Sequence, residues 1–208
     1  MPGKLKVQQF RGRFQESTGR LNLVLSGFHK QNIVTTDEIV EAINALPACH
    51  IELLQIIKYD PHRKMQRLTA WLTGKSEKRS VTAAYYNFDP PGIMLYQFSN
   101  LVQFYRMLYH EIGHYVQFRV IHQSSRDKWI HEIHPASSGY VSEYAKTNAA
   151  EDFAESYSFF CVYPNELAKY PEKMKFMAEE IFYLSPGSYD FQDEDPYGGI
   201  ETAYPDIV

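Results

Sequence analysis

Residues 99 to about 121 carry the strongest helix pattern in this 208-residue chain. The segment contains no proline, and it opens on Ser99 and Asn100, which are candidate N-caps. Its apolar residues recur at helical spacing, at Leu101, Tyr105, Leu108, Ile112, Tyr115 and Val116. The pattern predicts a helix of about six turns with one apolar face, and this long element limits how the rest of the chain can pack.

The middle of this helix reads His110-Glu111-Ile112-Gly113-His114. Histidines four residues apart share one face of a helix, where two neutral imidazoles can bind one Zn²⁺. Glu111 beside them can take a proton from metal-bound water. Random order of the same residues gives this spacing about 2 times in 100, so the assignment needs further ligands. Gly113 costs about 1 kcal/mol relative to alanine in a helix, which indicates that it permits close approach of a backbone near the metal.

A catalytic zinc site takes three protein ligands and leaves the fourth position to water. The best candidates follow Asn148, which opens a second predicted helix that runs to residue 162 and is ended by Pro164. Glu151 and Glu155 share one face of that helix, so one carboxylate can bind the metal while the other orients a ligand histidine or nearby backbone. The alternative is structural. Glu151 is then the cap partner of Asn148, and Glu155 is an ordinary exposed carboxylate.

The pentapeptide, Tyr144, Glu151 and Glu155 together resemble the metalloprotease domain of anthrax lethal factor. They are more similar still to the small secreted Pro-Pro endopeptidases of Gram-positive bacteria. The resemblance covers about residues 99–160, whereas the first 98 residues are similar only in size and in their mixture of strands and helices. It implies a zincin-like fold with the active-site helix between two lobes.

The resemblance also assigns roles to single residues. It implies zinc bound by His110, His114 and Glu151, with Glu111 as the general base. It implies further that Tyr144 offers its hydroxyl to the scissile carbonyl oxygen, where a phenol donor stabilises charge that develops only in the transition state. The structural alternative for Tyr144 is a packed side chain in a chain with 16 tyrosines.

The expected activity is that of a zinc-dependent endopeptidase acting on a peptide or protein substrate, and the resemblance implies proline-rich substrates and a secreted protein. We expect a monomer. Two alternatives remain: a cytosolic regulatory protease of the phage-repressor-cleaving type, which also has a His-Glu-x-Gly-His helix, and a non-catalytic toxin-type binding domain. The lack of an apolar signal segment after Met1 favours the cytoplasmic alternative, whereas the intact Glu111 weighs against a binding domain.

Aromatic side chains are candidates for the walls of a cleft that accepts proline rings. Trp71 and Tyr109 are the main substrate-binding candidates, followed by Tyr85 and Tyr86, and core packing is the alternative for each.

Other ionisable residues compete for the metal. Glu143 is the rival third ligand, whereas Asp152 points about 100° away from the face of Glu151. His131 and His134 are expected as surface histidines on a polar loop over residues 123–140.

A hydrophobic content of 44% and a charged content of 22% suit a single α+β domain. Thr35 and Glu38 have the form of a capping box and predict a helix up to Pro47. Strands are expected near residues 21–25, 50–57, 80–88 and 93–98. The domain is then a mixed strand-and-helix lobe over 1–98, a helical zinc-binding lobe over 99–184 and an acidic tail over 185–208.

Charge argues against nucleic acid as a partner, and hydropathy argues against a membrane-spanning segment. The net charge of −4 and the lack of long basic runs argue against nucleic acid. No apolar run approaches the roughly 18 residues of a membrane-spanning helix. The two cysteines, Cys49 and Cys161, do not decide the compartment.

Overall fold

The computed structural model describes residues 7–10, 13–18, 21–74, 83–86 and 91–183. The chain has an α+β fold and divides into two compact units, Met1–Glu111 and Ile112–Val208. The border between them lies inside helix α3, Leu101–Tyr115. The acidic tail expected over 185–208 lies outside the described residues.

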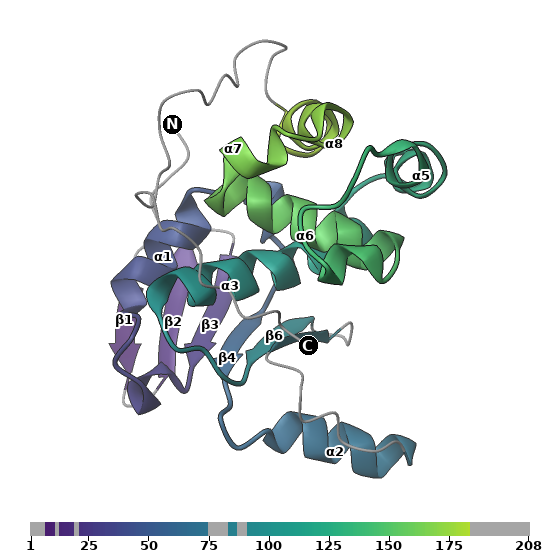
Figure 1. The fold of residues 1–208 in the computed structure, drawn as a ribbon. Coiled ribbons are helices and arrows are strands. Elements are labelled where there is room, and N and C mark those ends of the chain that lie inside the picture. The colour runs from purple at the N-terminus through teal and green to yellow at the C-terminus, as the bar shows by residue number, and fades with distance from the viewer. Residues whose placement is uncertain (1–6, 11–12, 19–20, 75–82, 87–90, 184–208) are drawn as a thin grey trace. The chain divides into compact units, whose positions relative to one another are not determined.

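The first unit contains one mixed sheet with the strand order β1-β2-β3-β4-β6-β5 (Figure 1). Its strands are β1 Val7–Phe10, β2 Arg13–Thr18, β3 Leu21–Ser26, β4 Ile56–Tyr59, β5 Ala83–Tyr86 and β6 Gly92–Leu95. The pairs β3–β4 and β4–β6 are parallel, and the other pairs are antiparallel. Strand β6 is buried along its whole length, whereas in β4 only Ile57 is buried, and the described part of β3 alternates between buried and half-buried residues.

Helix α1, Thr36–Asn44, and the first part of α3 lie on the same face of this sheet (Figure 1). The predicted capping box of α1 is confirmed, because Glu38 N donates to the Thr35 hydroxyl and Thr35 N donates to the Glu38 carboxylate. The core of the unit consists of fully buried side chains, among them Leu25, Ile39, Ile43, Ile57, Ile93 and Phe104. Apolar burial at this spacing is what fixes both helices on the sheet.

Gly27 is required where the chain leaves β3. Its φ is +84°, and a Cβ at this position would lie 2.2 Å from the carbonyl oxygen of Tyr59. Only glycine adopts this left-handed conformation while the backbone of the next strand lies so close.

Helix α2, Lys64–Thr73, follows β4 and ends at Gly74, which has a left-handed conformation. The strand expected over residues 50–57 was partly wrong: a 3-10 turn, η2, occupies Ala48–His50, and strand β4 begins only at Ile56.

The second unit is helical. After α3 it contains a π-helical turn η3 Val116–Val120, α4 Gln123–Lys128, a second π-helical turn η4 Trp129–Ile133, α5 His134–Ala136, a 3-10 turn η5 Tyr144–Lys146, α6 Ala149–Val162, α7 Pro164–Leu167, α8 Pro171–Phe176 and a third π-helical turn η6 Met177–Ile181. The helix expected between Asn148 and residue 162 is confirmed as α6.

The polar loop expected over residues 123–140 was wrong for its first part, which is helical up to Ala136. The reason is Trp129, which is fully buried, packs with ring centroids 5.2 Å from both Phe153 and Phe176, and donates its indole N–H to the carbonyl of Ala149 at 2.8 Å. One large anchor therefore fixes a segment whose other side chains are polar.

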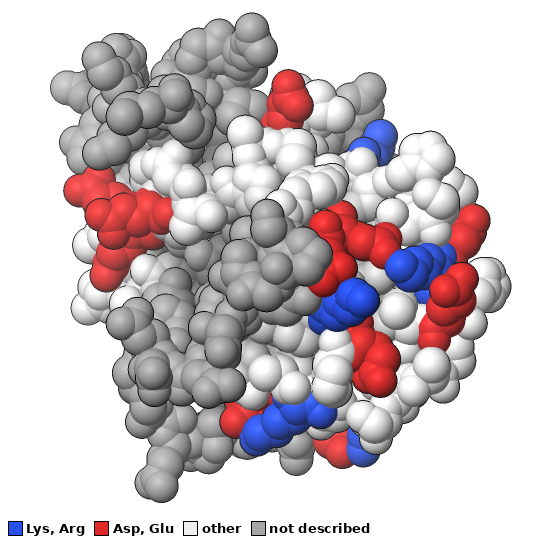
Figure 2. All heavy atoms as spheres, turned by 90° about the horizontal axis from the view of Figure 1, so that it is seen from above, with Lys and Arg blue, Asp and Glu red and all other residues white. Residues whose placement is uncertain are grey.

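Charged side chains of both signs lie next to one another on the face drawn in Figure 2. The described ion pairs of the second unit include Lys128–Glu180 and Lys169–Glu166. Exposed pairs of this kind contribute at most about 1 kcal/mol each. Among the described segments, none of the helices combines the length and the apolar character that crossing a bilayer requires.

Candidate metal centre

Helix α3 carries both histidines of the pentapeptide on one face. His110 and Glu111 are buried, and His114 is half-buried. The helix is regular through Tyr115, so the four-residue spacing places the two imidazoles one turn apart.

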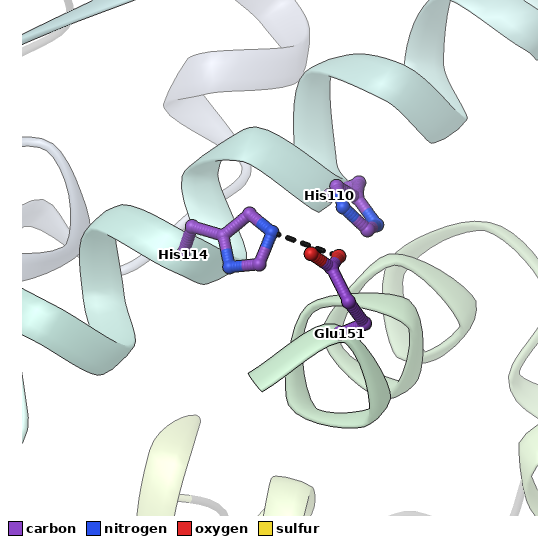
Figure 3. Close-up of side chains that lie close together, drawn as sticks. All are labelled: His110, His114 and Glu151. Atoms are coloured by element: carbon purple, nitrogen blue, oxygen red, sulfur yellow. Dashed lines mark hydrogen bonds and ion pairs between the residues drawn. The ribbon is translucent and has the colours of Figure 1, made fainter. Parts of the chain in front are cut away.

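Helix α6 supplies the third member of the group. The Asn148 side chain accepts from the backbone N–H groups of Ala150 and Glu151, which fixes the first turn of α6. Glu151, half-buried in that turn, approaches His114, and its Oε2 lies 3.1 Å from Nε2 of the imidazole (Figure 3). The cap partner role and the approach to His114 therefore coexist, because the cap uses the backbone of Glu151 and leaves its carboxylate available.

One ligand atom each from His110, His114 and Glu151 forms a group in which all atoms lie within 4.8 Å of one another (Figure 3). Two nitrogens and one carboxylate oxygen are a donor set that zinc takes in catalytic sites. Ligand atoms at usual zinc distances lie about 3.4 Å apart in a tetrahedral site, so this group can hold a metal ion with small side-chain adjustments.

Gly113 sets the spacing between α3 and α6. A Cβ at this position would lie 3.0 Å from Cα of Ala154 and 3.1 Å from Cβ of Tyr157. The predicted close approach of a backbone at Gly113 is confirmed, and the small side chain of Ala154 contributes to it.

Asp152, the residue after Glu151, points away from the metal group and is buried in a charged network. Its Oδ1 accepts from Nζ of Lys173 at 2.6 Å, and its Oδ2 lies 2.9 Å from Nδ1 of His134. Both Asp152 and Lys173 are fully buried. Burial raises the pKa of the Asp152 carboxyl against the opposing effect of the Lys173 ammonium, and burial lowers the pKa of Lys173.

The same lysine anchors the loop before η5. Nζ of Lys173 donates to the carbonyl of Gly139 at 2.9 Å and lies 4.5 Å from the ring centroid of Tyr140. The Tyr170 hydroxyl donates to the carbonyl of Tyr140 at 2.8 Å. Sequence reasoning missed Lys173, because a lysine in a polar helix gives no signal that its ammonium is buried.

Glu155 is buried and accepts from the hydroxyl of Ser142 at 2.6 Å. The same hydroxyl oxygen accepts from the backbone N–H of Ala145 at 3.1 Å, inside η5. Glu155 thus contacts the segment that carries Tyr144, whose side chain is 43% exposed. Sequence reasoning missed Ser142, which lies in a loop without a periodic pattern.

Glu111 belongs to the first unit, and its charge acts on Tyr96. The Tyr96 and Tyr86 hydroxyl oxygens lie 2.6 Å apart. Burial first, then the Tyr86 hydrogen bond and the charges of Asp60 and Glu111, raise the pKa of Tyr96. A neutral phenol thus lies near Glu111, and the sequence did not single it out because Tyr96 follows an apolar strand.

The other candidate residues lie in different surroundings. Tyr109 is buried and its hydroxyl donates to the carbonyl of Ala42 at 3.1 Å, which is the core-packing alternative. Trp71 is exposed on α2. The Glu143 carboxylate is exposed and pairs with Lys146, outside the metal group. His131 is exposed, and His134 is the partner of Asp152.

Comparison of the chain with known protein families, with curated proteins and with solved structures found no match. The site is therefore assigned on its own side chains, two imidazoles and a carboxylate with a glutamate beside the first histidine.

Proposed function

We propose that this protein is a zinc-dependent endopeptidase that uses Glu111 as its general base. The observation that carries the proposal is the convergence of His110, His114 and Glu151, each able to offer one ligand atom, with a buried glutamate directly after the first histidine. A purely structural metal site has no use for a carboxylate at that position.

Zinc held by these three side chains would supply a Lewis acid that polarises a carbonyl and makes water more acidic. Glu111 takes the proton of the attacking water and later delivers it to the leaving nitrogen. Tyr144 donates its hydroxyl to the carbonyl oxygen as negative charge develops there. The Ser142–Glu155 hydrogen bond restrains the segment before Tyr144, so that the phenol is positioned before the substrate binds.

Peptides or proteins are the substrates in this proposal, with proline-rich segments and a secreted location favoured by the resemblance given above. A donor-free, kinked backbone around proline suits a cleft that recognises rings more than backbone N–H groups.

Metal analysis combined with cleavage of a peptide library tests the proposal. We expect the wild-type protein to bind about one zinc and to cleave peptides at neutral pH. Glu111→Gln keeps the zinc and loses about 10²–10⁴-fold in turnover, because only the base is removed. Glu151→Ala weakens zinc binding by more than the roughly 10–100-fold that loss of an outer partner costs.

Zinc binding without any cleavage in the wild type would contradict the protease assignment. Unchanged zinc affinity in Glu151→Ala would show that Glu151 is not a ligand, and Glu143→Ala would then be the variant to compare.

A further inference from the structure

Helix α2 presents apolar side chains to solvent. Leu68, Trp71 and Leu72 follow one another at positions i, i+3 and i+4, and their exposed fractions are 47%, 78% and 67%. Trp71 is the most exposed of the large hydrophobic side chains that the structure describes. A helix of this length depends on packing of its apolar face for stability, so this exposed face fits a partner that the described residues do not provide.

The same region is strongly basic within an acidic protein. The net charge of the chain is −4, but residues 63–80 contain six cations and a single acid, Glu77. The cations are Arg63, Lys64, Arg67, Lys75, Lys78 and Arg79. Lys64 and Arg67 are exposed on α2 itself, beside the apolar side chains. The partner that this charge favours is anionic.

We propose that α2 binds an anionic lipid surface, with Trp71 and Leu72 entering the interface and the exposed cations of α2, Lys64 and Arg67, meeting the headgroups. Lys64 and Arg67 lie one turn before Leu68 and Trp71 on the same side of the helix, so the cations and the apolar side chains reach a surface together. Inserted tryptophan and leucine combined with nearby cations is how surface-bound helices hold anionic lipid. This inference does not depend on the proposed protease activity.

The area of the apolar face favours a lipid surface over a protein partner. One tryptophan and two leucines bury roughly 400–500 Å², using about 150–250 Å² for the tryptophan. A stable protein interface needs about 800 Å² on each side. A lipid interface needs no such area, because a few inserted side chains add to the attraction between cations and headgroups.

The fluorescence of the two tryptophans of the chain can measure binding to vesicles. Trp129 is fully buried in the second unit, whereas Trp71 is exposed, so a vesicle-induced change in emission reports on Trp71. We expect a blue shift with phosphatidylcholine vesicles that contain phosphatidylglycerol, and none with phosphatidylcholine alone. Trp71→Phe should still sediment with the vesicles but lose the shift, which assigns the signal.

Charge variants test the role of the cations. Each cation near an anionic surface contributes about fivefold to partitioning, so Lys64→Glu/Arg67→Glu should lower it at least about 25-fold. Lys169→Glu/Lys175→Glu makes the same change in net charge at exposed positions elsewhere, and it should leave binding within about twofold. Added salt should weaken wild-type binding.

Equal binding to neutral and anionic vesicles, no binding to either, or an equal loss in both charge variants would each overturn the proposal. A Trp71 shift with an acidic peptide but not with vesicles would assign the face to a protein partner instead, and a raised KM for a soluble peptide in Trp71→Phe without a vesicle effect would assign Trp71 to substrate binding. Circular dichroism and the emission of Trp129 show whether each variant is folded.

Discussion

A hydroxyl group links a carboxylate on α6 to the segment that carries Tyr144. Glu155 accepts from Ser142, and Ser142 accepts from the N–H of Ala145. Glu155 is buried, so its hydrogen bond is made away from competing water. The pair therefore restrains η5 without contributing an atom to the metal group.

We predict that Ser142→Ala lowers kcat about 10–100-fold and leaves zinc affinity within about twofold, because it releases η5 and keeps all three ligands. The measurements are peptide cleavage and competition for zinc with a chelator. Ser125→Ala on α4 is the matched control and should change neither. A loss of zinc affinity as large as the loss of kcat would show that Ser142 supports the metal group and not Tyr144.

Helices α1 and α6 begin where their side chains predict. Thr35 and Asn148 each satisfy backbone N–H groups of the first turn, and such caps are readable because donor and acceptor lie within three residues of one another. Helix α4, η4 and α5 could not be predicted from the sequence, because the contacts that stabilise them join residues that are distant in sequence. Their stability comes from Trp129, whose partners Phe153 and Phe176 lie far along the chain.

The capping box of α1 predicts that the folding stability of the protein depends on pH. Hydrogen bonds from the Thr35 backbone first, and then from its side chain, lower the pKa of Glu38. A lowered pKa in the folded state means that this contribution to stability is present above the ordinary glutamate pKa and is lost as the pH falls through the lowered value. We predict that Thr35→Ala costs about 1 kcal/mol at neutral pH and raises the pKa of Glu38 part of the way back.

Urea unfolding and an NMR titration of Glu38 are the measurements. Glu41→Ala removes an exposed carboxylate from the same helix and should cost less than about 0.5 kcal/mol. An ordinary Glu38 pKa in the wild type would contradict the assignment of the cap. So would an equal loss in the free energy of unfolding in Thr35→Ala and Glu41→Ala.

At the scale of the whole molecule, the metal group should couple binding to folding. A ligand that binds only the folded state at about 100 times its Kd adds about 2.7 kcal/mol. For a chain of this length we predict that zinc raises Tm by about 5–10 °C and that a chelator reverses the rise. Scanning calorimetry measures it, and Glu151→Ala, which lacks one ligand, should show little of the shift. An equal rise in the variant would place the bound zinc elsewhere.

The group that could hold a metal ion could be predicted because its parts follow local patterns: His110 and His114 repeat within one helix, and Glu151 lies in the first turn after the Asn148 cap. The supporting residues could not. Ser142 lies in a loop, Tyr96 follows an apolar strand, and Lys173 is a lysine with a buried ammonium. Each of these acts through a contact that only the tertiary fold creates.

The pair Glu151–Asp152 has a further consequence for how this site can vary. Consecutive residues of a helix point about 100° apart, so a carboxylate locked by Lys173 and His134 fixes the rotation of α6 about its own axis. The direction of Glu151 is thereby set by an interaction in which Glu151 takes no part. Because Asp152 holds this orientation, position 151 can exchange one donor atom for another while its direction is kept, whereas a change at position 152 removes the restraint itself.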